Sequence, residues 1–162
     1  MNWRRSLWIV GLCIALGGGG RSLWGTLRSQ RQAPREAETQ WNYTLAPRSG
    51  SLSDFEEVLA NAKIAGKPVM IDFFAEWCAA CKELDRLTYV DPQVSDELNR
   101  FIRVKIDSTD QTELIDQVQK RFEVVGLPTL IFFSSRGELL RERMVMGFIP
   151  PGPFLKELKK IP

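Results

Sequence analysis

Two cysteines separated by two alanines, Cys78 and Cys81, have the types and spacing for redox chemistry. They follow the apolar run 69–75, which is long enough for one buried strand and too short for a typical helix. Good helix formers lie between and after the cysteines, and Leu84 and Leu87 repeat at helical spacing. We therefore predict that Cys78 occupies the first turn of a helix and that Cys81 lies one turn later on the same face.

This placement predicts how each sulfur reacts. Free backbone N–H groups and the positive end of the helix dipole favour a thiolate, so we expect a lowered pKa for Cys78. Cys81 is then close enough to attack a mixed disulfide formed by Cys78. Thiol–disulfide exchange requires an exposed attacking thiolate and a nearby resolving thiol. We assign the attack to Cys78 and the resolution to Cys81, with a redox-active Cys78–Cys81 disulfide as the oxidised form.

Two carboxylates accompany the cysteines. Asp72 interrupts the apolar strand, where a charge is costly to bury unless it is paired or protonated. Asp85 follows Cys81 by four residues and so shares its helix face. A desolvated carboxyl group near the buried sulfur can accept its proton, which makes both aspartates candidate catalytic residues. The alternatives are an ordinary edge-strand aspartate for Asp72 and a solvated helix residue for Asp85.

The run 71–81, Ile-Asp-Phe-Phe-Ala-Glu-Trp-Cys-Ala-Ala-Cys, resembles the active-site strand and helix of thioredoxin-fold proteins. A closer resemblance, collinear from roughly residue 50 to the C-terminus, is to the periplasmic C-terminal domain of DsbD-type thiol reductases. Its counterparts here are the segments 77–85, 91–94, 126–129 and 147–148. Asp85 stands where that family more usually has a glutamate, and the multi-helix membrane domain of DsbD-type proteins has no counterpart in these 162 residues. The resemblance implies an α/β thioredoxin fold, a central mixed β-sheet with helices on both faces.

The resemblance also implies a second half of the site. In thioredoxin-like folds the proline corresponding to Pro128 is cis and lies against the cysteines, and the backbone of the preceding residue, here Leu127, pairs with the substrate chain. From the residues alone, Pro128 also fits a plain strand-initiating proline. We expect Trp77 to shield Cys78 and shape the docking surface, with a purely packing role as the alternative. The resembling lysine, Lys105, is a candidate charge partner for the buried aspartate or an exposed strand residue.

Hydrophobic periodicity and turn residues predict the elements that position these side chains. A capping box at 53–56 opens a helix that Gly66 ends, and the segment 134–137 is a turn. The predicted order is βαβαβαββα. We expect strands at 41–45, 69–75, 101–106, 129–133 and 139–146, and helices at 53–65, from Cys78 onward, at 91–100, 110–122 and 154–161.

The N-terminal part has a different composition. Residues 1–40 hold 6 Arg against 2 Glu, whereas 41–162 hold 16 Lys or Arg against 18 Asp or Glu. We interpret 1–27 as a signal peptide or an N-terminal membrane anchor, with 7–27 as a possible membrane tether, and 28–40 as a polar linker. The thioredoxin-like domain is predicted at 41–162. The domain's charge balance argues against a nucleic-acid surface, and the absence of histidine excludes His-based catalysis and most zinc sites.

The sequence thus predicts an exported enzyme, a protein-disulfide reductase or electron relay that needs no cofactor or metal. No cation between the cysteines stabilises a Cys78 thiolate, and the two aspartates raise thiol pKa values, which favours a reductant. A reductant in an oxidising compartment needs an electron source. The resemblance implies a membrane thiol reductase as donor, disulfide-bearing exported proteins or other thiol-redox proteins as acceptors, and a periplasmic or otherwise extracytoplasmic location, secreted or anchored to the inner membrane. The alternatives are a cytochrome c maturation or disulfide isomerase-type protein and, more remotely, a Cu(I)-binding module.

Overall fold

The computed structural model describes residues 40–162, so the predicted segment 1–27 and all but the last residue of the predicted linker 28–40 lie outside the described residues. The five predicted strands and five predicted helices are present in sequence, which gives the order βαβααβαββα; the string βαβαβαββα counted the helix from Cys78 onward and the helix at 91–100 as one helix. One turn of π-helix (η1) and one of 3-10 helix (η2) are added. The elements are β1 (Tyr43–Leu45), α1 (Leu52–Ile64), β2 (Val69–Phe74), α2 (Ala79–Glu83), η1 (Leu84–Thr88), α3 (Pro92–Leu98), β3 (Ile102–Asp107), α4 (Glu113–Phe122), β4 (Thr129–Phe133), η2 (Arg141–Arg143), β5 (Val145–Met146) and α5 (Pro151–Leu158).

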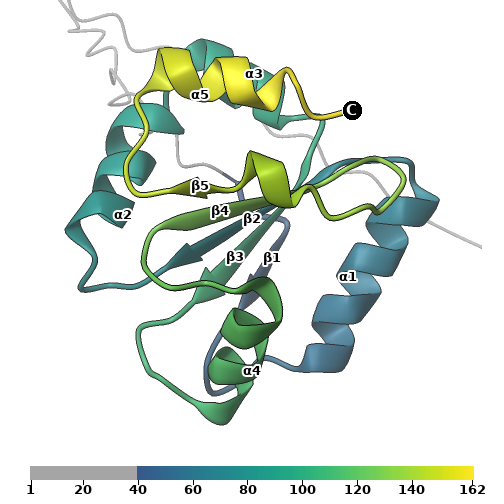
Figure 1. Ribbon diagram of the computed structural model, residues 1–162, viewed down its shortest axis with the longest axis vertical. Helices are drawn as coiled ribbons and strands as arrows, with labels where there is room; N and C mark the ends of the chain where they lie inside the picture. The colour runs from purple at the N-terminus through teal and green to yellow at the C-terminus, as the bar shows by residue number, and fades with distance from the viewer. Residues whose placement is uncertain (1–39) are drawn as a thin grey trace, which may run out of the picture. The chain divides into compact units, whose positions relative to one another are not determined.

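The strands form one mixed sheet in the order β1-β3-β2-β4-β5. β3 pairs in parallel with both β1 and β2, whereas β4 runs antiparallel to β2 and β5. Figure 1 shows α1 and α4 on one side of this sheet and α2, α3 and α5 on the other. The predicted thioredoxin fold, a central mixed sheet with helices on both faces, is confirmed.

Strand β2 lies at the centre of the sheet, and its alternating side chains reach two separate cores. Val69, Ile71 and Phe73 pack with residues of α1 and α4, while Met70 packs with residues of η1, α3 and α5. Because successive side chains of a strand point to opposite faces, Asp72 lies on the Met70 face. The carboxyl group of Asp72, the only one on β2, therefore lies on the side of the sheet that carries the cysteines.

Several element boundaries differ from prediction, and two of the differences lie at helix N-termini. The N-cap of α1 is Ser51, whose hydroxyl accepts the N–H groups of Ser53 and Asp54 at 3.1 and 3.4 Å, so the capping box at 53–56 is wrong. Helix α4 begins at Glu113, behind the N-cap Thr112, and not at residue 110.

The predicted strand 139–146 is wrong over most of its length. Only Val145–Met146 forms β5, and a single bridge joins Leu139 to Phe133. After Leu140 the backbone forms the 3-10 turn η2 (Arg141–Arg143) instead of continuing the ladder. The N–H groups of Arg143 and Met144 donate to the carbonyl oxygens of Leu140 and Arg141, at 3.0 and 3.2 Å, within this turn.

Candidate active site

The two cysteines form a disulfide at the start of α2. Their sulfurs are bonded at 2.05 Å and their Cα atoms lie 5.3 Å apart. Cys78 has extended backbone angles and is the N-cap of α2, and its Sγ accepts the N–H of Cys81 at 3.2 Å. The helix N-terminus therefore lies at Cys78, as the helix formers after it predict.

Both sulfurs are covered in this oxidised form. Cys78 is 5% exposed and Cys81 3%, and they pack with Ala75, Phe74 and Leu127. The expectation of an exposed Cys78 is therefore wrong for the disulfide state. Phe74 and Leu127 pack against the two cysteines and cover them.

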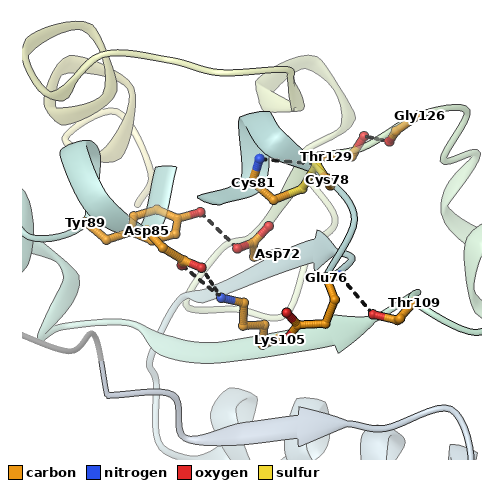
Figure 2. The surroundings of a disulfide bond; sticks show 10 residues. All are labelled: Asp72, Glu76, Cys78, Cys81, Asp85, Tyr89, Lys105, Thr109, Gly126 and Thr129. Atoms are coloured by element: carbon orange, nitrogen blue, oxygen red, sulfur yellow. Dashed lines mark hydrogen bonds and ion pairs between the residues drawn. A yellow bond between two sulfur atoms is a disulfide. The ribbon is translucent and has the colours of Figure 1, made fainter. Parts of the chain in front are cut away.

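Asp72 is buried beneath the disulfide, as Figure 2 shows, with 2% of its surface exposed. Its Oδ2 accepts a hydrogen bond from the hydroxyl of Tyr89 at 3.2 Å, and its Oδ1 has no partner. The pKa of Asp72 is raised from its ordinary 3.8 to about 7: desolvation is the largest cause and Asp85 adds to it, whereas Lys105 and the Tyr89 hydrogen bond lower the pKa. A carboxyl group with this pKa can take up or release a proton at neutral pH.

Lys105 forms its ion pair with Asp85 and acts on Asp72 only as a nearby charge, which lowers the pKa of Asp72. With 8% of its surface exposed, Lys105 is not the exposed strand residue of the alternative prediction. Its Nζ donates to both carboxylate oxygens of Asp85, at 2.8 and 2.9 Å. Lys105 lies opposite Asp72 in the β2–β3 register, and its Nζ lies 4.4 Å from the ring centre of Phe74 and 4.8 Å from that of Trp41. Asp85 is therefore half-buried and ion-paired: its side chain is 38% exposed, and its carboxylate binds the lysine that also acts on Asp72.

Trp77 and the loop after β3 form one rim of the site. Trp77 is 68% exposed, and its Nε1 donates to the carbonyl oxygen of Thr109 at 3.3 Å. The hydroxyl of the same threonine accepts the N–H of Glu76 at 2.9 Å. Thr109 thus holds both residues that precede Cys78, and the indole is presented to solvent beside the disulfide.

Leu127 and Pro128 lie on the other side of the cysteines. The Leu127–Pro128 peptide bond is cis, and the Leu127 side chain packs against the cysteine cluster. Thr129, the first residue of β4, donates its hydroxyl proton to the carbonyl oxygen of Gly126 at 2.7 Å, which closes this short turn (Figure 2). The structure therefore brings together the cysteines, Asp72 and the Leu127–Pro128 turn.

Sequence reasoning missed three residues of the site, namely Tyr89, Thr109 and Trp41. Tyr89 follows Cys81 and Asp85 at a further spacing of four, and this ladder was the available signal. Thr109 and Trp41 act from a loop and from the chain before β1, and no local pattern points from either one to the cysteines.

Within residues 40–162 no group of three or more His, Cys, Asp or Glu side chains is placed to hold a metal ion. Over the same residues no helix has the length and apolar character needed to cross a membrane.

Comparison with known proteins agrees with this geometry. The chain is 40% identical over 111 residues to the thiol:disulfide interchange protein DsbD of Pseudoalteromonas atlantica and 36% identical over 126 residues to DsbD of Vibrio cholerae. These matches cover 68% and 78% of this chain but only 19% and 21% of the relatives, so the chain spans about a fifth of their length.

Solved structures show the same fold. The oxidised C-terminal domain of DsbD from Neisseria meningitidis is 26% identical with a TM-score of 0.59, and the match covers 68% of this chain and 94% of that one. A thioredoxin from Thermus thermophilus, also 26% identical with a TM-score of 0.59, matches over 75% of this chain and 86% of its own. The family of thioredoxin-like domains matches residues 55–162. The chain belongs to the thioredoxin-like domain family.

Proposed function

We propose that this chain is a DsbD-type thiol:disulfide interchange protein that works outside the cytoplasm as a disulfide reductase or electron relay. The observation that carries the proposal is the Cys78–Cys81 disulfide at the N-terminus of α2, directly above the buried carboxyl group of Asp72. Dithiol exchange needs an attacking sulfur, a resolving sulfur and a group that moves the proton, and these three residues have the required types and positions.

The reaction begins with the reduced domain. The Cys78 thiolate attacks a partner's disulfide; a Cys78–partner S–S bond forms, and the partner's other sulfur leaves and takes up a proton. Asp72 then accepts the thiol proton of Cys81, and the Cys81 thiolate attacks Cys78 Sγ. The intramolecular disulfide forms and the partner's second sulfur leaves, so two electrons pass from this domain to the partner.

The rims of the site are suited to hold the partner chain. Trp77 offers an exposed aromatic surface, and the Leu127–Pro128 turn borders the cysteines from the other side. In this proposal an extended segment of the partner pairs with the backbone of Leu127.

Reduction of the disulfide after each turnover requires a second dithiol. We assign this role to a membrane thiol reductase and the role of acceptor to exported proteins that carry disulfides. The N-terminal segment 1–27 delivers the domain across the membrane, as a cleaved signal or as an anchor. A reporter enzyme that is active only after export, fused behind residue 40, should be active; an inactive, cytoplasmic fusion would refute the location.

Replacement of the resolving thiol tests the assignment of roles. Cys81→Ser should accumulate a mixed disulfide between Cys78 and its partner, visible as a heavier band on non-reducing gels, because no second thiol displaces the partner. All variants carry Cys13→Ser so that the third cysteine does not contribute. The matched control, Cys78→Ser, should trap nothing. Stable complexes with Cys78→Ser alone would reverse the two roles, and full reductase activity of Cys81→Ser without any complex would refute the mechanism.

A further inference from the structure

The two carboxyl oxygens of Asp72 have different surroundings. Oδ2 is held by the Tyr89 hydroxyl at 3.2 Å, whereas Oδ1 is buried and has no hydrogen-bond partner among the described residues. In Figure 2 Tyr89 and the disulfide lie on different sides of Asp72. A buried carboxyl oxygen without a hydrogen-bond partner is energetically unfavourable. Such an oxygen in a native protein calls for an explanation, and one explanation is that it receives a proton during the reaction.

We propose that Tyr89 is a positioning residue for the exchange reaction: its hydroxyl holds Oδ2 of Asp72 and so directs Oδ1 to take the proton of the Cys81 thiol. This inference rests on the proposed function and adds to it the residue that orients the proton acceptor. In the reverse direction the Asp72 carboxylic acid returns the same proton to the Cys81 sulfur as the Cys78–Cys81 bond is broken.

Tyr89 is firmly held in this orientation. It is 1% exposed, and its ring packs between those of Trp41 and Phe154, with centroid distances of 5.7 and 5.9 Å. Burial and the neighbouring Asp72 raise the pKa of Tyr89 well above its ordinary value. The phenol therefore remains a hydrogen-bond donor across the working pH range.

The π-helical turn explains how Tyr89 reaches the site. The N–H of Tyr89 donates to the carbonyl oxygen of Leu84, five residues back, at 2.9 Å. In an α-helix, residues four apart advance slightly more than one full turn, whereas in a π-helix they advance slightly less. One α-turn followed by one π-turn therefore keeps Cys81, Asp85 and Tyr89 on the side of the helix that faces Asp72.

The groups around Asp72 act on its charge in opposite directions. Burial and Asp85 of η1 raise its pKa, while Lys105 of β3 and the Tyr89 hydroxyl lower it. Its register partner on β4 is the apolar Leu130. Removal of the hydroxyl should therefore raise the pKa of Asp72 above about 7 and leave less carboxylate to accept a proton at neutral pH.

Tyr89→Phe in the full chain, with Cys13→Ser, tests the inference. Single-turnover oxidation of the reduced protein by a chromogenic aromatic disulfide reports the exchange rate. At pH 7 the variant should react about fivefold more slowly, since the loss of one hydrogen bond to a carboxylate lowers its ionised fraction from about a half to about a tenth. The rates should converge at higher pH, and the carbon-13 titration of the Asp72 carboxyl group should shift in the same direction.

The chain offers matched controls because it has only two tyrosines, Tyr43 and Tyr89. Tyr43→Phe removes a hydroxyl from β1 and should leave the pH profile unchanged. In an Asp72→Asn background, Tyr89→Phe should have no further effect on the profile. If Tyr89→Phe does not fold, fluorotyrosine incorporated into Tyr43→Phe labels Tyr89 alone. Its more acidic phenol is a stronger donor and should move the profile to lower pH.

The outcomes separate the two proposals. An unshifted Asp72 titration in Tyr89→Phe, or a rate loss that is equal at every pH, would overturn the role of Tyr89 and leave the cysteine mechanism intact. Failure of Cys81→Ser to trap a partner, with activity kept, would instead refute the proposed function. A shift of the pH profile to higher pH in the fluorotyrosine protein would also overturn the positioning role of Tyr89.

Discussion

At the residue scale, the proposed mechanism depends on the carboxyl group of Asp72. It is held in a desolvated position and has one neutral donor, so its charged form is disfavoured and its pKa is raised to about 7. The nearby cation does not neutralise it directly, because Lys105 Nζ is bound by both oxygens of Asp85. This arrangement leaves Asp72 able to exchange a proton instead of locking it in an ion pair.

The raised pKa of Asp72 lowers the stability of the fold by an amount that depends on pH. Asp72 ionises at about 3.8 in the unfolded chain and about 7 in the fold, so the folded state binds more protons between these values. The free energy of unfolding therefore falls as pH rises from about 4 to about 7, and the full cost, at most about 4 kcal/mol, applies above that range.

Asp72→Asn should remove this cost. We expect the oxidised variant to be more stable than the wild type by a few kcal/mol near pH 8, and equally stable near pH 3, where Asp72 is largely protonated in both states. Guanidinium unfolding at the two pH values measures the difference. Curves that shift in parallel at both pH values would show that Asp72 is not the titrating group.

At the element scale, the central strand and the helix that follows it determine the geometry of the site. The side chain of Asp72 on β2 points to the face covered by α2, η1, α3 and α5. Cys78 begins α2 just after the C-terminal end of β2. Thr109 joins the loop after β3 to the two residues before Cys78. The opposite face, covered by α1 and α4, carries the second core and neither of the two cysteines.

The cap of α1 tests this separation of roles. Ser51→Ala should lower the free energy of unfolding by about 1 kcal/mol, because two N–H groups lose their acceptor. Ser53→Ala is the matched control and should cost much less, since the Ser53 hydroxyl caps no N–H group. Chemical unfolding measures both effects, and neither variant should change the reduction potential of the cysteines. A larger loss of unfolding free energy in Ser53→Ala than in Ser51→Ala would show that Ser53 caps the helix, as the capping box at 53–56 predicts.

At the scale of the whole molecule, the charges around the cysteines bear on the direction of electron flow. The described chain places two carboxylates close to the cysteines and neutralises only Asp85, with Lys105. No cation lies between the cysteines to stabilise a Cys78 thiolate, and it is stabilisation of the reduced form that makes a strong oxidant. The balance favours a domain that gives electrons to other disulfides.

The reduction potential of Cys78–Cys81 measures this balance. We expect a value near that of thioredoxin, about −270 mV, for the full chain with Cys13→Ser equilibrated in dithiothreitol or glutathione buffers. Alkylation followed by mass measurement of the peptide that holds both cysteines gives the reduced fraction. A value near about −120 mV would identify an oxidant and reverse the proposed electron flow.

The sequence by itself determined the order of the elements and the core of the site. An apolar run, helix formers behind a Cys-Ala-Ala-Cys segment and a proline before a strand are local signals, because they depend on residues within one or two turns of each other. Asp72 was recognisable as a buried carboxylate since it interrupts such a run. These short-range rules placed Cys78, Cys81 and Asp72 before any contact was known, whereas the position of Pro128 against the cysteines followed from the resemblance to thioredoxin-like folds.

The tertiary structure alone decided how the charges and hydrogen bonds are shared. The bond from Tyr89 to Asp72 joins residues 17 apart, and that from Lys105 to Asp85 joins residues 20 apart. Local sequence cannot predict such partners, because strand register and a single π-turn determine which of several nearby acceptors each donor side chain reaches. The same holds for the burial of Cys78 by Phe74 and Leu127 and for the predicted strand 139–146, which the turn η2 interrupts.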